Sequence, residues 1–161
     1  MSETRFKSGR IKDVVIRDLT RHTDSRGWLT ELFRQDEVEP AYRPVMAYIS
    51  TTQPGVARGP HEHTDQADFF AFLGPSTFRI HLWDNRKESP TYGTKQVIEA
   101  GENAPKSIII PAGVVHAYRN IGGSEGMVLN FPNRLFTGWG RREPVDEVRH
   151  ENDPSTAFSL D

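Results

Sequence analysis

Residues 55–74 read GVARGPHEHTDQADFFAFLG. His61 and His63 are two residues apart in this stretch, and Asp68 follows just before an apolar run. Side chains alternate between the two faces of a strand, so both imidazoles are expected to point into the same cavity. Further along, a Pro-x-Gly turn is followed by His116. These residue types predict a general-base site, a metal site or a mixture of the two.

The segments on either side of this stretch carry the hydrophobic pattern of a β-protein. The heptapeptide TFRIHLW (77–83) has strict period two, which is typical of a strand with two different faces. Turn signals recur roughly every 8–12 residues, and no stretch has a long helical period. We expect strands at 11–19, 28–34, 45–51, 68–73, 77–83, 95–100, 107–111, 114–120 and 126–131, with a short helical turn within 35–44. The pattern predicts an all-β sandwich or barrel.

The composition narrows the class of protein. A chain of 161 residues predicts a single domain, with its core at about 11–140 and a polar tail at 141–161 that is either frayed or packed over a cavity mouth. The absence of cysteine excludes disulfides and thiolate metal sites. A net charge of −2 gives no attraction for nucleic acid or an anionic membrane. With no long apolar run, we expect a soluble, cytoplasmic protein.

Five short motifs occur in an order that is similar to that of a known enzyme family. They are DSRG with a following glutamate (24–31), GVARGPH (55–61), WDNR with SPTYG (83–93), IPAG with a following histidine (110–116) and NDP (152–154). In this order the chain resembles the dTDP-4-dehydrorhamnose 3,5-epimerases and their nucleotide-sugar relatives over most of its length. The resemblance implies a cupin-type jelly roll, a homodimer, and an epimerase or isomerase of a 4-keto-6-deoxy sugar nucleotide, with dTDP as the nucleotide and no cofactor.

The resemblance also implies roles for individual residues. His61 matches the catalytic base, and Asp153 is the best match for the carboxylate that orients it. An imidazole with a near-neutral pKa can remove a proton next to a ketone if the enolate is stabilised. The residues implied in substrate binding are Arg26, Glu31, Arg58, Gln66, His116 and Arg119.

At several positions the chain departs from the family. Asp68 occupies the place where the family has lysine, and His63 replaces a glutamine. The family's tyrosine acid falls near Asn130, and its glutamine and asparagine fall near Met46 and Tyr48. A single epimerisation or a ketoisomerisation would tolerate a missing acid better than a double epimerisation.

A rival interpretation uses the same residues. His61, His63, Asp68 and His116 nearly reproduce the two metal motifs of cupins, with Asp in place of the usual Glu. Three imidazoles and one carboxylate suit a divalent transition metal such as Fe, Mn, Ni or Zn, in an isomerase or an oxygenase. A third hypothesis is a sugar-binding cupin without catalysis. The sequence leaves these alternatives open.

Overall fold

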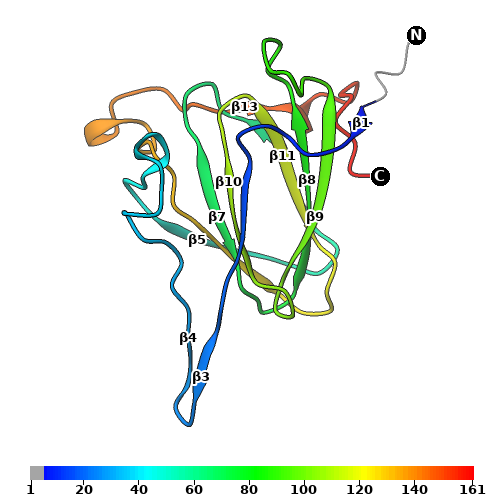
Figure 1. Ribbon diagram of the computed structural model, residues 1–161. Coiled ribbons are helices and arrows are strands. Elements are labelled where there is room, and N and C mark those ends of the chain that lie inside the picture. The colour runs from blue at the N-terminus through cyan, green and yellow to red at the C-terminus, as the bar shows by residue number, and fades with distance from the viewer. Residues whose placement is uncertain (1–5) are drawn as a thin grey trace.

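The computed structural model describes residues 6–161, which form a sandwich of two β-sheets with a projecting hairpin (Figure 1). The six-stranded sheet has the order β1-β9-β8-β11-β6-β13, and the five-stranded sheet has the order β2-β10-β7-β12-β5. The strands are β1 (Lys7–Ser8), β2 (Val15–Asp18), β3 (His22–Asp24), β4 (Gly27–Leu29), β5 (Tyr48–Thr52), β6 (Ala57–Glu62), β7 (Asp68–Phe72), β8 (Thr77–Asp84), β9 (Thr94–Gly101), β10 (Lys106–Ile110), β11 (Val114–Asn120), β12 (Gly126–Asn130) and β13 (Val148–Arg149). Three short 3-10 helices are η1 (Pro40–Tyr42), η2 (Trp139–Arg141) and η3 (His150–Asn152). The predicted all-β sandwich is confirmed.

Strand β8 shows how the sequence pattern produces the core. Its apolar residues Phe78, Ile80 and Leu82 are at most 1% exposed and pack between the two sheets. Trp83 points to the opposite face, where it is covered by Phe158 from the end of the chain. From Ile80 to Asp84, both faces of this strand are therefore buried.

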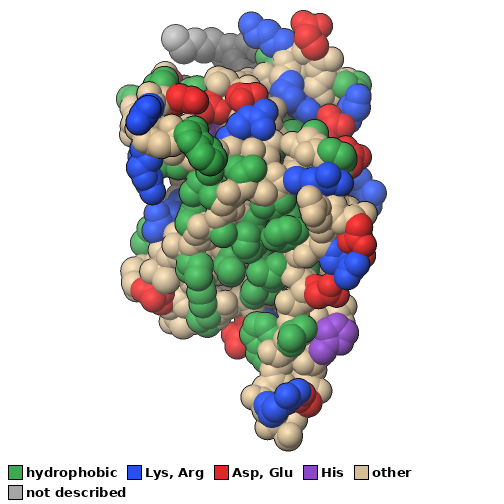
Figure 2. All heavy atoms as spheres, turned by 90° about the vertical axis from the view of Figure 1, so that its left-hand side faces the viewer, with side chains coloured by type: hydrophobic (Ala, Val, Ile, Leu, Met, Phe, Trp, Pro, Cys, Tyr) green, Lys and Arg blue, Asp and Glu red, His purple; other side chains and the backbone are tan. Residues whose placement is uncertain are grey.

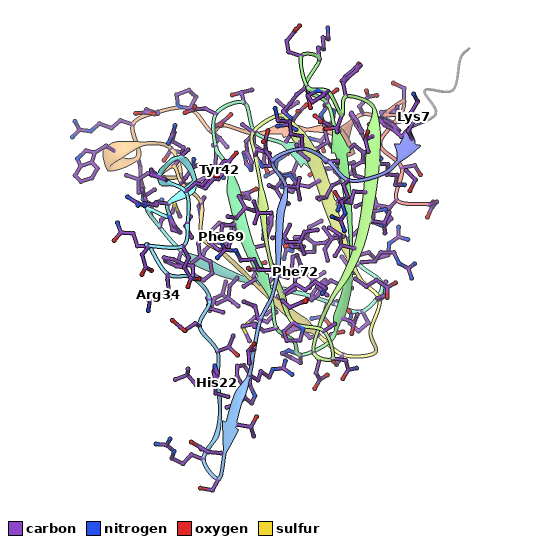
Figure 3. All side chains as sticks on the ribbon, viewed as in Figure 1. Lys7, His22, Arg34, Tyr42, Phe69 and Phe72 are labelled. Carbon is purple, nitrogen blue, oxygen red and sulfur yellow. The ribbon has the colours of Figure 1, made fainter. Side chains whose placement is uncertain are left out.

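The outer face of the five-stranded sheet is apolar as well. Phe69 and Ile109 pack there with Val38 and Tyr42, while Phe72 points between the sheets (Figure 3). Hydrophobic side chains gather on this side of the molecule in the space-filling view (Figure 2). Ile49 of β5 is 62% exposed. It alternates with Ser50, whose Oγ lies 3.3 Å from the hydroxyl oxygen of the buried Tyr118, so Ile49 faces outward.

Two expected strands are shorter than predicted. The strand expected at 28–34 ends at Leu29, because β4 pairs only with β3 in the hairpin that projects from the sandwich. The strand expected at 11–19 is reduced to β2, since Asp13 adopts a positive φ in the preceding turn. The helical turn expected within 35–44 is confirmed as η1.

The C-terminal tail is packed against the sandwich and is not frayed. Strand β13 pairs with β6, and its Arg149 lies opposite His61 in the register. In the described part of the chain no helix combines the length and the apolar character needed to cross a membrane.

The end of β8 is held by a buried carboxylate. Asp84 is fully buried and accepts hydrogen bonds from Arg86 Nε at 2.8 Å, Ser89 Oγ at 2.6 Å and Thr91 Oγ1 at 2.6 Å. Burial alone would raise the pKa of Asp84, but these donors lower it to about 2. The charged carboxylate thereby ties the 84–91 loop to the sheet.

Replacing Asp84 by Asn should lower the free energy of unfolding by about 2 kcal/mol at pH 7, because the charge-assisted hydrogen bonds are lost. A carboxylate with a depressed pKa stabilises the protein above its unfolded-state value and loses that effect as the pH falls through its folded value. The difference between the proteins should therefore shrink from about pH 4 towards pH 2.

Urea denaturation across this pH range measures the effect. Asp18→Asn is the control, since Asp18 pairs with Lys106 at the surface and should change stability by less than about 1 kcal/mol. Equal losses in both variants would contradict the assignment.

Candidate active site

The pairing of β6 with β11 brings the first two histidines together. His61 lies directly opposite His116 in the antiparallel register, and their ring centroids are 4.5 Å apart. The strands approach closely at Gly59, where an added Cβ would lie 2.5 Å from the carbonyl oxygen of His116. Gly59 also has a φ of +83°, so glycine is required here for two reasons.

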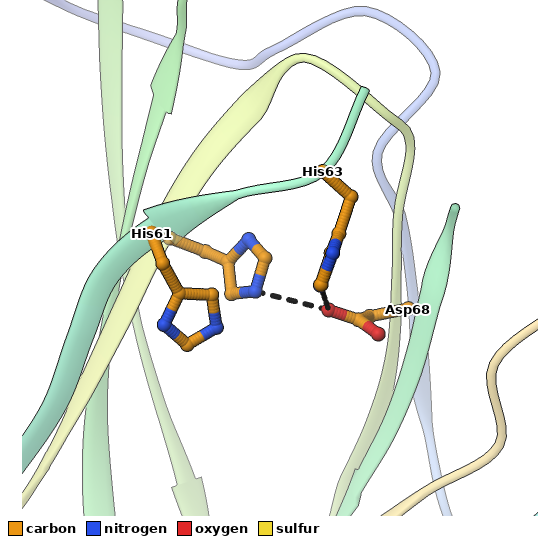
Figure 4. Close-up of side chains that lie close together, drawn as sticks. His61, His63 and Asp68 are labelled. Carbon is orange, nitrogen blue, oxygen red and sulfur yellow. Dashed lines mark hydrogen bonds and ion pairs between the residues drawn. The ribbon is translucent and has the colours of Figure 1, made fainter. Parts of the chain in front are cut away.

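His63 and Asp68 complete the cluster. Nε2 of His63 and Nε2 of His116 each lie 3.0 Å from Oδ2 of Asp68 (Figure 4). One ligand atom from each of these residues and from His61 falls within 4.8 Å of all the others. The structure thus brings together the three histidines and the aspartate that the sequence singles out.

The second oxygen of Asp68 is fixed by two amides. Oδ1 accepts hydrogen bonds from Gln66 Nε2 at 2.9 Å and from Asn130 Nδ2 at 2.9 Å. Asn130 Nδ2 also donates to the hydroxyl oxygen of Tyr48 at 2.8 Å, and Asn130 Oδ1 accepts from the backbone N–H of Phe69. The orientation of the carboxylate is therefore set by the five-stranded sheet.

The electrostatics of the cluster follow from burial and from close charges. Burial, reinforced by neighbouring His116, lowers the pKa of His61 to about 3, so the free ring is neutral. Burial would lower the pKa of His63, but the hydrogen bond and charge of Asp68 raise it to about 9. Burial would raise the pKa of Asp68, and the adjacent imidazoles hold it well below its usual range.

A cavity of about 440 Å³ opens beside the cluster. His61 and Arg58 line it from β6, and Tyr48 lines it from β5 of the other sheet. A hollow of about 570 Å³ near Trp139 is larger, but none of the clustered imidazoles lines it. The smaller cavity is therefore the candidate active site.

The predicted substrate-binding residues divide into two groups. Arg58 lines the cavity and donates from Nη2 to the carbonyl of Thr51 at 2.7 Å, while His116 is buried in the cluster behind it. Gln66 contacts Asp68 and does not line this cavity. The structure brings only part of the expected set to the cavity.

The remaining predicted residues lie elsewhere. Arg26 pairs with Asp24 on the projecting hairpin, and Glu31 is an exposed residue after it. Arg119 is an odd number of residues from His116 on β11 and pairs with Asp161 on the opposite face of the sheet. None of the three lines the cavity of its own chain.

The structure does not place Asp153 against the base. Its carboxylate is exposed and accepts hydrogen bonds from the backbone N–H and the Oγ of Ser155. The carboxylate near His61 is Glu147, whose Oε1 lies 3.9 Å from Nδ1 of the ring. Pairing of β13 with β6 brings Glu147 there, and its other oxygen accepts from Arg149 Nε at 2.8 Å.

Among the cavity residues that the sequence does not single out as candidates are Tyr48, Tyr118 and Glu147. Tyr118 could have been found, because it is two residues after His116 on one strand and so shares its face. Tyr48 was noted only as a departure from the family. Burial and the charge of Asp68 raise its pKa to about 12, so its hydroxyl stays protonated.

Comparisons with known proteins identify the family of this chain. A family model described as dTDP-4-dehydrorhamnose 3,5-epimerase matches residues 8–130. The chain belongs to this family. The family prediction is thereby confirmed, together with the enzyme class, an epimerase or isomerase of nucleotide sugars.

Two curated proteins are similar to this chain in sequence. The probable low-salt glycan biosynthesis epimerase Agl13 of Haloferax volcanii is 36% identical over 127 residues, 78% of this chain and 81% of the relative. The spore coat polysaccharide biosynthesis protein SpsL of Bacillus subtilis is 33% identical over 126 residues, 78% of this chain and 82% of the relative.

Solved structures confirm the cupin jelly roll. A dTDP sugar isomerase from Desulfovibrio desulfuricans superposes with a TM-score of 0.77 at 19% identity, covering 94% of each chain. Two further structures of this fold contain dTDP sugars. A 3,5-epimerase from Legionella pneumophila (20% identical, TM-score 0.74, covering 89% of this chain and 76% of that one) is in complex with dTDP-4-keto-L-rhamnose. The 3'-monoepimerase ChmJ from Streptomyces bikiniensis (17% identical, TM-score 0.73, covering 89% of this chain and 72% of that one) is in complex with dTDP-quinovose.

Proposed function

We propose that this protein epimerises a 4-keto-6-deoxy nucleotide sugar, with dTDP as its nucleotide, by removing and returning a proton next to the ketone. The observation that carries the proposal is that a neutral imidazole and a protonated phenol line one cavity from different sheets. His61 comes from β6, and Tyr48 comes from β5. Inversion of a carbon needs a base on one face and an acid on the other, which this arrangement supplies.

In this mechanism His61 takes the proton and Glu147 orients the ring. The 3.9 Å separation of the two is longer than a hydrogen bond, and such contacts often tighten when substrate binds. Tyr48 then donates its hydroxyl proton to the opposite face of the enolate. Its oxygen already accepts a hydrogen bond from Asn130, which leaves the O–H free to point into the cavity.

Arg58 is the cation we assign to the nucleotide sugar. Its guanidinium is held at the cavity wall by Thr51 and Thr52, and a planar guanidinium suits phosphate oxygens. The dTDP sugars named for the D. desulfuricans isomerase support this choice of substrate. A cytoplasmic location, where nucleotide sugars are made, stays a prediction.

Changing His61 to Asn should abolish the uptake of solvent deuterium into dTDP-4-keto-6-deoxyglucose, lowering its rate by about 10²–10⁴-fold. Binding of dTDP should persist, because Arg58 is unchanged. Mass spectrometry of the sugar and calorimetry with dTDP measure the two effects. A native protein that binds dTDP without any deuterium uptake would favour a non-catalytic sugar-binding cupin.

Changing Tyr48 to Phe separates proton removal from inversion. Deuterium should still enter the sugar through His61, while epimerised product should fall by about 10²-fold or more. Tyr118→Phe is the matched control, because its hydroxyl is 3.3 Å from Ser50 Oγ and the variant should keep more of the product. Equal loss of product in both variants would contradict Tyr48 as the acid.

We also propose a homodimer. The projecting hairpin exposes Trp28 and Leu29, and β5 exposes Ile49. Hydrophobic side chains gather on one face of the molecule in the space-filling view (Figure 2). Contiguous apolar surface of this kind is typical of an interface. The same hairpin carries Arg26 away from its own chain, where a second copy can meet it.

Light scattering should therefore give twice the chain mass of 18.3 kDa. Ile49→Lys places a charge in the proposed interface and should shift the protein towards the monomer, whereas the exposed Val97→Lys on β9 of the other sheet should not. A native monomer at micromolar concentration would contradict the dimer.

A further inference from the structure

Two histidines in the cluster present the same nitrogen to the same oxygen. Nδ1 of His63 contacts the carbonyl oxygen of Asp146, and Nδ1 of His116 lies 3.1 Å from the carbonyl oxygen of Val114. A carbonyl oxygen only accepts hydrogen bonds, so Nδ1 carries the hydrogen in each ring. In the neutral form, both Nε2 atoms then carry a lone pair and lie 3.0 Å from Oδ2 of Asp68.

Adding a proton to each imidazole would not relieve the repulsion between the two lone pairs and the carboxylate oxygen equally well for both rings. A second proton on His63, at Nε2, would form a hydrogen bond to Asp68. A second proton on His116 would not. Its Nε2 is buried and has no hydrogen-bond partner among residues 6–161, although Oδ2 is 3.0 Å away. Protonating it would leave a second buried imidazolium at one carboxylate, with an unpaired N–H.

A cation bound between the two Nε2 atoms and Oδ2 would compensate all three electron pairs. Around an ion with bonds of about 2.1 Å, neighbouring ligand atoms at right angles are about 3 Å apart, which matches both 3.0 Å distances. The surrounding contacts are those of a metal site, because histidine ligands donate their other N–H to carbonyls and ligating carboxylates are themselves hydrogen-bonded. Gln66 and Asn130 hold the free oxygen of Asp68 in this way.

We propose that Nε2 of His63, Oδ2 of Asp68 and Nε2 of His116 bind one divalent first-row transition metal ion. Two imidazoles and a carboxylate suit such ions. His61 lies beside this three-residue core and is not part of it. Its ring faces the cavity, and among residues 6–161 it has no hydrogen bond that fixes one nitrogen. The inference rests on coordination geometry and stands independently of the proposed reaction.

Such an ion would add a function to the cavity. A ligand set of three leaves coordination positions open, and the cluster borders the cavity through His61 and His63. A carbonyl oxygen bound there would be polarised, which makes a neighbouring C–H more acidic. Substrates with a ketone next to a removable proton fit this arrangement.

Metal content of the native protein tests the proposal without any substrate. After treatment with EDTA and dialysis, the protein should take up about one Zn²⁺, Ni²⁺ or Co²⁺ per chain by mass spectrometry of the element, and its melting temperature should rise. Bound Co²⁺ should give visible absorption bands from its nitrogen and oxygen ligands. If none of the three ions binds, the proposal is wrong.

Substitutions test whether Ni²⁺ binding depends on the three proposed ligands and not on other buried histidines. Asp68→Asn and His116→Gln should each weaken Ni²⁺ binding at least about 10-fold, and His63→Gln serves if either fails to fold. The control is His81→Gln, which removes an equally buried histidine of β8 outside the cluster and should keep the ion. Unchanged Ni²⁺ binding in the folded cluster variants, or an equal loss in the control, would overturn the site.

His61→Asn distinguishes this inference from the proposed function. The variant should keep one ion per chain while it loses deuterium uptake. Loss of the ion in this variant would overturn the three-residue core and the free base together. A native protein that binds the ion but never exchanges deuterium would contradict the proposed reaction alone.

Discussion

The buried carboxylate of Asp68 is the constraint on which the site depends. At 1% exposure, its charge is costly unless close partners compensate it. Those partners come from both sheets: Asn130 from β12 of one, and His116 from β11 of the other, with His63 after β6 and Gln66 before β7. One ionised group thus fixes how the two sheets meet at the cavity.

The alternation of side chains between the two faces of a strand predicted more of the structure than any other feature of the sequence. It placed Trp83 on the face opposite Leu82, and it brought His61 and His63 to one site, as the structure has them. The same rule argues against Arg119 as a substrate ligand, because an odd number of residues separates it from His116. The resemblance implies Arg119 as a substrate ligand, but the alternation of side chains along the strand already places it on the opposite face from His116.

The path of the tail could not be predicted. The sequence after residue 140 has no strong period, so it does not point to Glu147, and Asp153 is the partner that the resemblance implies. Their difference comes from long-range contacts: the carboxylate of Asp146 accepts hydrogen bonds from the backbone N–H groups of residues 64–66, and β13 then pairs with β6. Local sequence does not encode such a contact, since both partners lie in irregular segments.

Asn130 shows how a site can keep its chemistry when one residue changes. The acid expected near this position is missing, but Tyr48 is its partner across the β12–β5 register. A phenol on the adjacent strand reaches the same cavity, and Asn130 holds its oxygen by a hydrogen bond. The asparagine thereby links the proposed acid to Asp68. Because one amide nitrogen donates to both oxygens, a movement of the carboxylate is transmitted to the phenol, so a single side chain positions both Asp68 and the proposed acid.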